Sequence, residues 1–234
     1  RADQHYLVTG PGADNIGQQS GGWTISWQGT GNTNADFPGA TSIFGGLKQQ
    51  LEAAGGSVTT DESAEVDAAI FVFGETPYAE MQGDVYSVAW YDQRAERSRM
   101  KALKDRGIPV VAVFLTGRPM WVNDILNLSD AFVVSWLPGS EGQGVADVLL
   151  RDADGGVQHD FTGKLPMPWP ALDVNATDRD LPVDAFAFPI GYGLAVTDAV
   201  AWSELSEALI GADNSLDQEI FKGGPRGFWK LFSG

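Results

Sequence analysis

Short apolar runs separated by amphipathic stretches constrain the fold of this chain most strongly. The runs Ala69–Phe73 (AIFVF) and Val110–Phe114 (VVAVF) are apolar at consecutive positions, so both faces of these strands should be buried. Three more strands are expected at Tyr6–Thr9, Ser57–Thr60 and Ala131–Val134. A glycine, proline, aspartate or serine follows each run and ends it.

Three of the intervening stretches have helical patterns. Ser42–Ala54 carries an apolar residue at every fourth position before a glycine pair, Asp92–Arg106 is rich in alternating charge, and Val145–Leu150 is a shorter candidate. Strands joined by crossover helices predict an α/β fold, here a three-layer α/β/α sandwich with a mostly parallel central sheet. Ligands of such sheets collect at the carboxyl ends of the strands.

The length of 234 residues fits one large domain, which we expect to cover residues 1–194. Residues 195–234 differ in texture and are expected to form a C-terminal extension or linker. A weak helical pattern at Trp202–Leu209 is the main feature there. The chain opens on Arg-Ala-Asp-Gln without an initiator methionine or a signal peptide, so we expect it to be a fragment of a longer protein.

Composition excludes several classes of function. The chain has 15 Lys plus Arg against 31 Asp plus Glu, a net charge of -16 that repels nucleic acid and anionic lipid. No apolar run is long enough for a membrane span. Cysteine is absent and the two histidines, His5 and His159, are far apart, so neither a thiolate nucleophile nor a histidine-rich metal site is expected. Calcium held by carboxylates stays open.

Two glycine-bordered segments follow predicted strands and carry the chemistry. Gly21–Gly29 (GGWTISWQG) contains two tryptophans, and Gly74–Asp84 (GETPYAEMQGD) contains three carboxylates. Sugar C–H faces stack on aromatic rings, while paired carboxylic acids transfer protons at a glycosidic oxygen. The two segments together therefore indicate a site for sugars.

Other motifs fail when their full requirements are examined. Gly10-Pro11-Gly12 follows a strand as a dinucleotide fingerprint does, but no third glycine follows at the required spacing, and Asp14-Asn15 occupy the position where a helix N-terminus should hold phosphate. Ser140 has no histidine nearby, so a serine hydrolase triad is disfavoured. A flavodoxin-like nucleotide-binding domain remains an alternative that rests on the strand and helix pattern alone.

Several motifs in order along residues 5–194 resemble the second domain of glycoside hydrolase family 3, the family of β-glucosidases and exo-acting β-glucan hydrolases. They are Gly10–Gly17, Gly21–Gly29, Gly74–Asp84, Thr116–Pro119, Trp136–Leu149, Phe161–Pro166 and Gly191–Leu194. The two tryptophans together with the Pro-Tyr-Ala-Glu sequence are most similar to the exo-β-glucanase branch. The resemblance implies a secreted or periplasmic hydrolase of β-glucans or β-glucosides.

The resemblance also implies a partner domain. In this branch an N-terminal (β/α)8 barrel supplies the aspartate nucleophile of a retaining mechanism, and 234 residues are too few to hold that barrel as well. The isolated chain is therefore expected to be inactive. The alternative is a non-catalytic carbohydrate-binding or interaction module of the same fold. Neither a cofactor nor a metal is implied, and the sequence does not fix which β-linkage is cleaved.

By the same resemblance, Glu80 is the catalytic acid/base, and Trp27 is one jaw of an aromatic clamp around the sugar beyond the cleaved bond. Trp23, Asp84 and Arg118 are further candidates for substrate binding. Trp23 has packing in the core as its alternative, and Arg118 has a salt bridge to an acidic loop residue. Glu75, in the same segment as Glu80, is expected to be a structural acceptor for loop amides.

Overall fold

A computed structural model describes residues 4–85, 87–90, 93–152, 154–173, 186–198, 200 and 203–209 of the chain. Its main sheet has five parallel strands in the spatial order β2-β1-β3-β4-β5. They are β1 (His5–Thr9), β2 (Ser57–Thr59), β3 (Ala68–Gly74), β4 (Val110–Leu115) and β5 (Ala131–Trp136). All five predicted strands are confirmed, with ends that differ by one or two residues.

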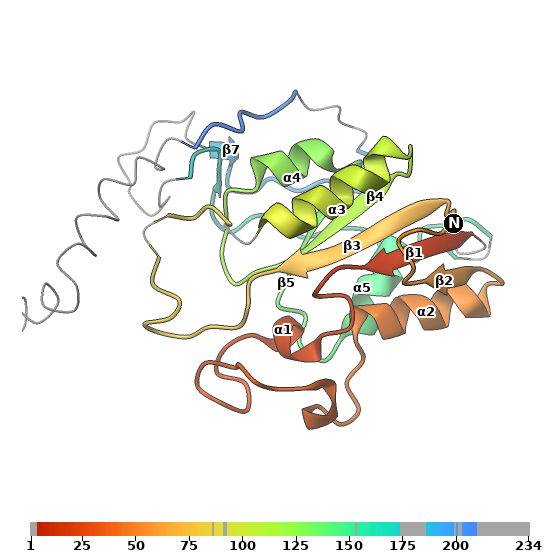
Figure 1. The fold of residues 1–234 in the computed structure, drawn as a ribbon, viewed down its shortest axis with the longest axis horizontal. Helices are drawn as coiled ribbons and strands as arrows, with labels where there is room; N and C mark the ends of the chain where they lie inside the picture. The colour runs from red at the N-terminus through yellow and green to blue at the C-terminus, as the bar shows by residue number, and fades with distance from the viewer. Residues whose placement is uncertain are drawn as a thin grey trace, which may run out of the picture.

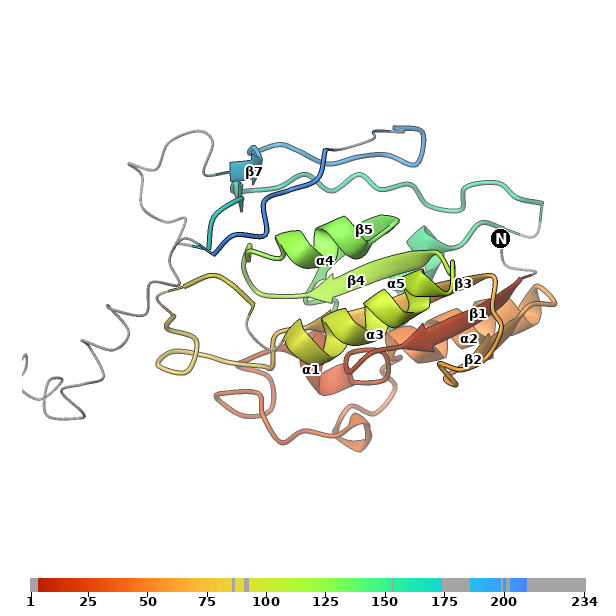
Figure 2. The ribbon, with the colours of Figure 1, turned by 45° about the horizontal axis from the view of Figure 1, so that its top comes forward.

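Helices cover both faces of this sheet (Figure 1, Figure 2). On one face lie α2 (Ile43–Ala53) and α5 (Gly142–Leu149), and on the other α3 (Gln93–Asp105) and α4 (Asn123–Leu128). The two halves of the core follow the alternation of side chains along the strands. In β3, for example, Ile70 and Val72 pack on the α2 and α5 side, whereas Ala69, Phe71 and Phe73 pack on the α3 and α4 side. The predicted three-layer sandwich is confirmed.

The helices differ from the prediction where they are short or begin with glycine. The helix α5 begins at Gly142, three residues before the predicted start. A Cβ atom at Gly142 would lie 2.3 Å from the Ser42 carbonyl carbon, so glycine is required for this close approach. The helices α1 (Ile16–Ser20) and α4, and the 3-10 turn η1 (Asn34–Asp36), were not predicted, because three to six residues are too few to show a helical period.

Residues 203–209 lie beside α4, two of whose side chains bond their backbone. Strands β6 (Trp169–Pro170) and β7 (Phe186–Phe188) form a small antiparallel pair. The sequence left residues 195–234 unassigned, and despite the weak helical pattern residues 203–209 are not helical. Instead, the Asn127 side chain bonds both the N–H and the carbonyl of Leu205 at 2.9 Å, which holds this backbone in an extended course. Residues 210–234, most of the predicted extension, lie outside the described residues.

In the part of the chain that the structure describes, no helix is both long and apolar enough to cross a membrane.

Candidate active site

Two loops meet at the carboxyl edge of the sheet. The indole loop (residues 21–29) follows β1 and α1, and the Glu80 loop (residues 75–84) leaves β3 directly. In Figure 1 both run beyond the arrowheads of β1 and β3. Since β1 and β3 are parallel neighbours in the sheet, their carboxyl ends bring the two loops together, as the sequence predicted.

The bases of the two loops pack backbone against backbone. A Cβ atom at Gly22 would lie 1.9 Å from the carbonyl oxygen of Tyr78, so only glycine permits this contact. The indole loop closes on itself through a bond from the Trp23 N–H to the Trp27 carbonyl, at 2.9 Å. The contact at Gly22 fixes the distance between the loop that carries the tryptophans and the loop that carries Glu80.

Glu80 presents an exposed carboxylate to both indoles. Trp27 Nε1 donates to Glu80 Oε2 at 2.6 Å, and Trp23 Nε1 donates to Oε1 at 3.2 Å. The bond from Trp27 is the largest cause that holds the pKa of Glu80 below its ordinary value, and the Trp23 bond contributes in the same direction. In this geometry Glu80 is ionised at neutral pH and its two oxygens are held by fixed donors.

The tryptophan side chains of the indole loop lie at the surface rather than in the core. Trp23 is 70% exposed and Trp27 43% exposed, with ring centroids 6.2 Å apart and planes tilted by 44°. Core packing is therefore not the role of either ring. Rings at the surface whose N–H groups both bind one carboxylate leave their apolar faces available to a ligand.

The backbone of both loops is strained near these groups. Trp23, Ile25 and Met81 have φ values of 56°, 63° and 71°, a region that residues other than glycine rarely occupy. Ile25 is the most unfavourable of the three, because its side chain is β-branched, and it is also exposed. Such strain persists where the surrounding structure determines the conformation, and it is concentrated at functional sites.

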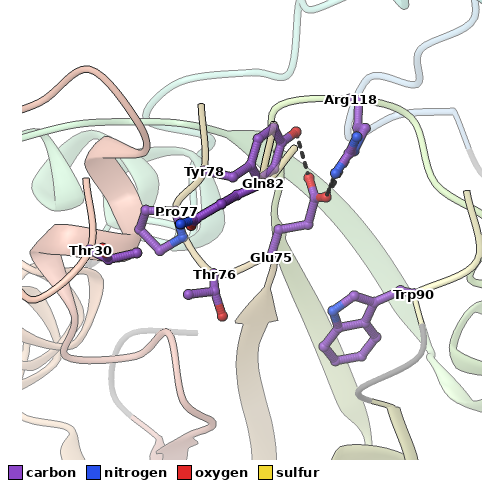
Figure 3. A pocket seen from close by; sticks show the side chains of 8 residues that line it. All are labelled: Thr30, Glu75, Thr76, Pro77, Tyr78, Gln82, Trp90 and Arg118. Atoms are coloured by element: carbon purple, nitrogen blue, oxygen red, sulfur yellow. Dashed lines mark hydrogen bonds and ion pairs between the residues drawn. The ribbon is translucent and has the colours of Figure 1, made fainter. Parts of the chain in front are cut away.

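The carboxylate of Glu75 is fully engaged, and Figure 3 shows its contacts with Tyr78 and Arg118. Its buried carboxylate pairs with Arg118, which donates from Nε at 2.9 Å and from Nη2 at 2.7 Å. Thr116 Oγ1 donates to it at 2.7 Å and the Tyr78 hydroxyl at 3.0 Å. Burial, followed by the nearby Glu75 charge, raises the pKa of the Tyr78 hydroxyl. Glu75 is thus a structural acceptor, but among the described residues the expected loop amides contribute only the Gly117 N–H at 3.4 Å, and its main donors are side chains.

Arg118 supports the Glu80 loop. Besides its ion pair with Glu75, it donates from Nη1 to the Gly83 carbonyl at 2.5 Å, and its guanidinium lies 4.3 Å above the ring of Tyr78. The salt bridge anticipated for Arg118 is present. Asp84 ends the same loop with an exposed side chain, and its N–H donates to the Met81 carbonyl at 3.3 Å.

Gln28 is a site residue that the sequence analysis did not single out. Its Oε1 accepts from the N–H of Ala79 at 2.7 Å, and its Nε2 donates to the main-chain carbonyl of Glu80 at 3.0 Å. The available signal was its place next to Trp27 in the glycine-bordered motif. An amide in a loop does not reveal its partner, however, so the sequence alone could not assign this contact.

A pocket of about 270 Å3 is lined in part by the Glu80 loop. Five of its lining residues belong to the Glu80 loop, and the others are Thr30, Trp90 and Arg118 (Figure 3). The five are Glu75, Thr76, Pro77, Tyr78 and Gln82. Glu80 and the two exposed indoles are not among the lining residues. The exposed carboxylate of Glu80 therefore lies outside this pocket.

Metal, phosphate and serine chemistry find little support in the described residues. Within these, no cluster of three or more His, Asp or Glu side chains could hold a metal ion. After Gly10-Pro11-Gly12, the side chain of Asn15 accepts from the Gln18 N–H and caps α1, which leaves that N–H unavailable to a phosphate. The Ser140 hydroxyl donates to the neighbouring Glu141.

Sequence comparisons with known proteins agree on one family. The sequence model described as the glycosyl hydrolase family 3 C-terminal domain matches residues 1–196. A lysosomal beta glucosidase from Dictyostelium discoideum is 30% identical over an alignment of 189 residues, which covers 71% of this chain and 22% of that protein. A periplasmic beta-glucosidase from Salmonella typhimurium is 35% identical over 78 residues, 33% of this chain and 9% of that protein.

Solved structures agree. An exo-1,3/1,4-beta-glucanase from a Pseudoalteromonas species superimposes with a TM-score of 0.83 at 49% identity, covering 89% of this chain and 27% of that one. A beta-glucosidase from Listeria innocua shares the fold, with a TM-score of 0.59 and 21% identity over 83% of this chain and 30% of that one. The chain thus spans less than a third of the length of these relatives. On the match over residues 1–196, the chain belongs to glycoside hydrolase family 3, to its C-terminal domain.

Proposed function

We propose that this chain is the second domain of a retaining exo-acting β-glucan hydrolase or β-glucosidase, in which Glu80 is the acid/base. One observation carries the proposal: the Glu80 carboxylate is exposed on an open face and held by the N–H groups of two exposed indoles. A carboxyl group that transfers protons to a sugar oxygen must be reachable and fixed, and Glu80 is both. Glu75, the other glutamate of the loop, is already saturated by Arg118 and two hydroxyls.

The proposed reaction needs a second carboxylate on a separate (β/α)8 barrel. A barrel aspartate attacks the anomeric carbon while Glu80 gives its proton to the departing oxygen. A water molecule then attacks the anomeric carbon of the glycosyl-enzyme and gives its proton to Glu80. The bond to the aspartate breaks, and glucose leaves with β configuration. Glu80 returns to its protonated form, which closes the cycle.

Glu80 must be protonated to begin that cycle, whereas the indole bonds lower its pKa. Docking of a barrel on this open face would bury Glu80 and bring the aspartate charge near it, and both effects raise the pKa of a carboxyl group. We therefore place the working acid in the assembled enzyme, not in this domain alone.

Trp27 is proposed to stack on the sugar beyond the cleaved bond. Stacking recognises the face of a ring and not the positions of its hydroxyls, so more than one β-linkage should be accepted. The relative named as an exo-1,3/1,4-beta-glucanase, 49% identical to this chain, supports that proposal. A secreted or periplasmic location is also proposed, with support from the relative described as periplasmic.

The replacement Glu80→Ala in the full-length protein tests the proposal. Release of glucose from natural glucans should fall about 10²–10⁴-fold, because their leaving groups need protonation. Aryl glucosides with good leaving groups should lose much less, and azide should restore part of the activity by attacking in place of the water that Glu80 activates. Glu65→Ala, at a side chain that is 97% exposed, serves as the control. Equal losses on both substrate classes without azide rescue would mean that Glu80 is not the acid/base.

A further inference from the structure

Few hydrogen bonds within the Glu80 loop fix the backbone at Glu80 itself. Its internal main-chain bonds are local, such as those from the Gln82 N–H to the Glu80 carbonyl at 3.0 Å and from the Gly83 N–H to the Ala79 carbonyl at 2.8 Å. Residues 75–79 belong to no helix or strand, and Met81, directly after Glu80, has a φ of 71°. The position of the Glu80 backbone therefore depends on contacts from residues outside this loop.

Gln28 provides such a contact at two points. Its Oε1 accepts from the Ala79 N–H at 2.7 Å and its Nε2 donates to the Glu80 carbonyl at 3.0 Å. These two backbone groups flank the peptide bond that joins Ala79 to Glu80. A single planar amide thus fixes both the position and the direction of the chain at Glu80, without touching the carboxylate.

The base of Gln28 is itself rigid. The next residue, Gly29, has a φ of 71°, and a Cβ atom there would lie 2.2 Å from the Gly21 carbonyl oxygen. Asn32 Nδ2 donates to the carbonyls of Gly29 at 3.1 Å and Thr24 at 3.3 Å, which ties the two sides of the indole loop together. Gln28 is consequently presented from a fixed backbone, so its amide can act as a template for the Glu80 loop.

We propose that Gln28 is a positioning residue for the acid/base: it sets the place of the Glu80 backbone so that the carboxyl group reaches the glycosidic oxygen. This inference rests on the proposed function of Glu80. Trp23 and Trp27 bond the carboxylate, so their replacement alters both its position and its proton affinity. Gln28 bonds main-chain atoms of the Glu80 loop, so its replacement should disturb position.

The test is Gln28→Met in the full-length protein, since methionine has a similar length but neither hydrogen-bonding group. Because displacement of a catalytic group by about 1 Å can cost about 10²-fold, kcat/KM on natural β-glucans should fall about 10- to 100-fold. On activated aryl glucosides, which need little protonation, we expect a fall of about threefold or less. The matched control is Gln158→Met, which removes an amide that donates to the Leu150 carbonyl at 3.2 Å, far along the chain from Glu80.

A double replacement separates positioning from general damage. If Gln28 acts through Glu80, adding Gln28→Met to Glu80→Ala should change kcat/KM on natural glucans by about twofold or less, because coupled residues are not additive. A loss that persists in the Glu80→Ala background, or one of equal size on both substrate classes, overturns the inference. If Gln28→Met fails to fold, Gln28→Asn keeps a neutral amide that is one methylene too short to reach both backbone groups, and should show the same leaving-group dependence.

The same kinetic data test the role of Glu80 and the role of Gln28 separately. One outcome is that Glu80→Ala shows a strong leaving-group dependence and azide rescue while Gln28→Met shows no such dependence. That pair of results overturns the role of Gln28 and leaves the role of Glu80 standing. A Glu80→Ala enzyme without dependence or rescue overturns the proposed function and the role of Gln28 with it.

Discussion

Replacing Trp27 by phenylalanine and by alanine separates the two roles proposed for its indole. Phenylalanine keeps an aromatic face but removes Nε1, the atom that donates to Glu80 at 2.6 Å. Alanine removes both. The side chain is 43% exposed and lies outside the two core clusters, so neither change should lower the melting temperature by much.

The expected sizes follow from the contacts. Aromatic stacking is worth about 0.5–1.5 kcal/mol beyond area burial, and about 1.4 kcal/mol corresponds to a tenfold change in affinity. Trp27→Ala should therefore raise KM for disaccharides about two- to tenfold, and Trp27→Phe should keep most of that affinity. The Trp27 bond is the largest cause of the low pKa of Glu80, so both changes should raise that pKa. A higher pKa keeps the acid protonated to higher pH, which moves the basic limb of the kcat/KM profile upward.

The assay is steady-state kinetics of the full-length protein on a disaccharide and on a small aryl glucoside across pH, with a thermal scan of each variant. Trp23→Phe is the matched control, because it removes a longer bond, of 3.2 Å, to the other oxygen of Glu80 and should move the pH profile less. A Trp27→Ala variant with a lower melting temperature and equal losses on both substrates would contradict a role of Trp27 in sugar binding. In that case Trp27 would be a packing residue.

Two further predictions concern the isolated domain and the contact between its loops. The 234-residue chain alone should fold yet release no glucose from laminarin-type oligosaccharides in a sensitive assay, because the nucleophile is expected on the barrel; turnover by pure chain would contradict the proposed division of roles. Gly22→Ala should lower the free energy of unfolding by about 1–3 kcal/mol in denaturant titrations, since its Cβ would lie 1.9 Å from the Tyr78 carbonyl oxygen. The control Gly144→Ala adds a Cβ that meets nothing within 4 Å, so it should be neutral or slightly stabilising.

The sheet and its covering helices could be read from the sequence because the pattern is repeated over long segments. The helix α2 buries Ile43, Leu47 and Leu51 completely, so its period is visible in the sequence. The helix α4 has six residues, and its two asparagines bond the backbone of Leu205 and Ser206 across some 80 positions of chain. Partners so distant leave no local pattern, which is why the sequence could not assign a structure to the residues around Leu205.

The candidate site divides in the same way. Parallel strands place the indole loop and the Glu80 loop at one edge, and the family motifs single out Glu80 and Trp27. That Glu80 binds the indole N–H groups, however, depends on the approach of Gly22 to Tyr78, which no periodicity expresses. The pairing of Glu75 with Arg118 likewise requires the register that sets Gly74 opposite Leu115 in β3 and β4.

The distribution of charge and exposure at Glu80 bears on why two domains would be needed. A general acid must be fixed in place and protonated, and these demands conflict, because the donors that fix a carboxylate also stabilise its ionised form. In this domain the two indoles and Gln28 hold Glu80 in position, whereas the pKa of its exposed carboxyl group stays below the ordinary value, which disfavours the protonated form. A barrel that closes over Glu80 would raise its pKa without removing the contacts that hold it, so the proposed assembly supplies position from one domain and protonation from the other.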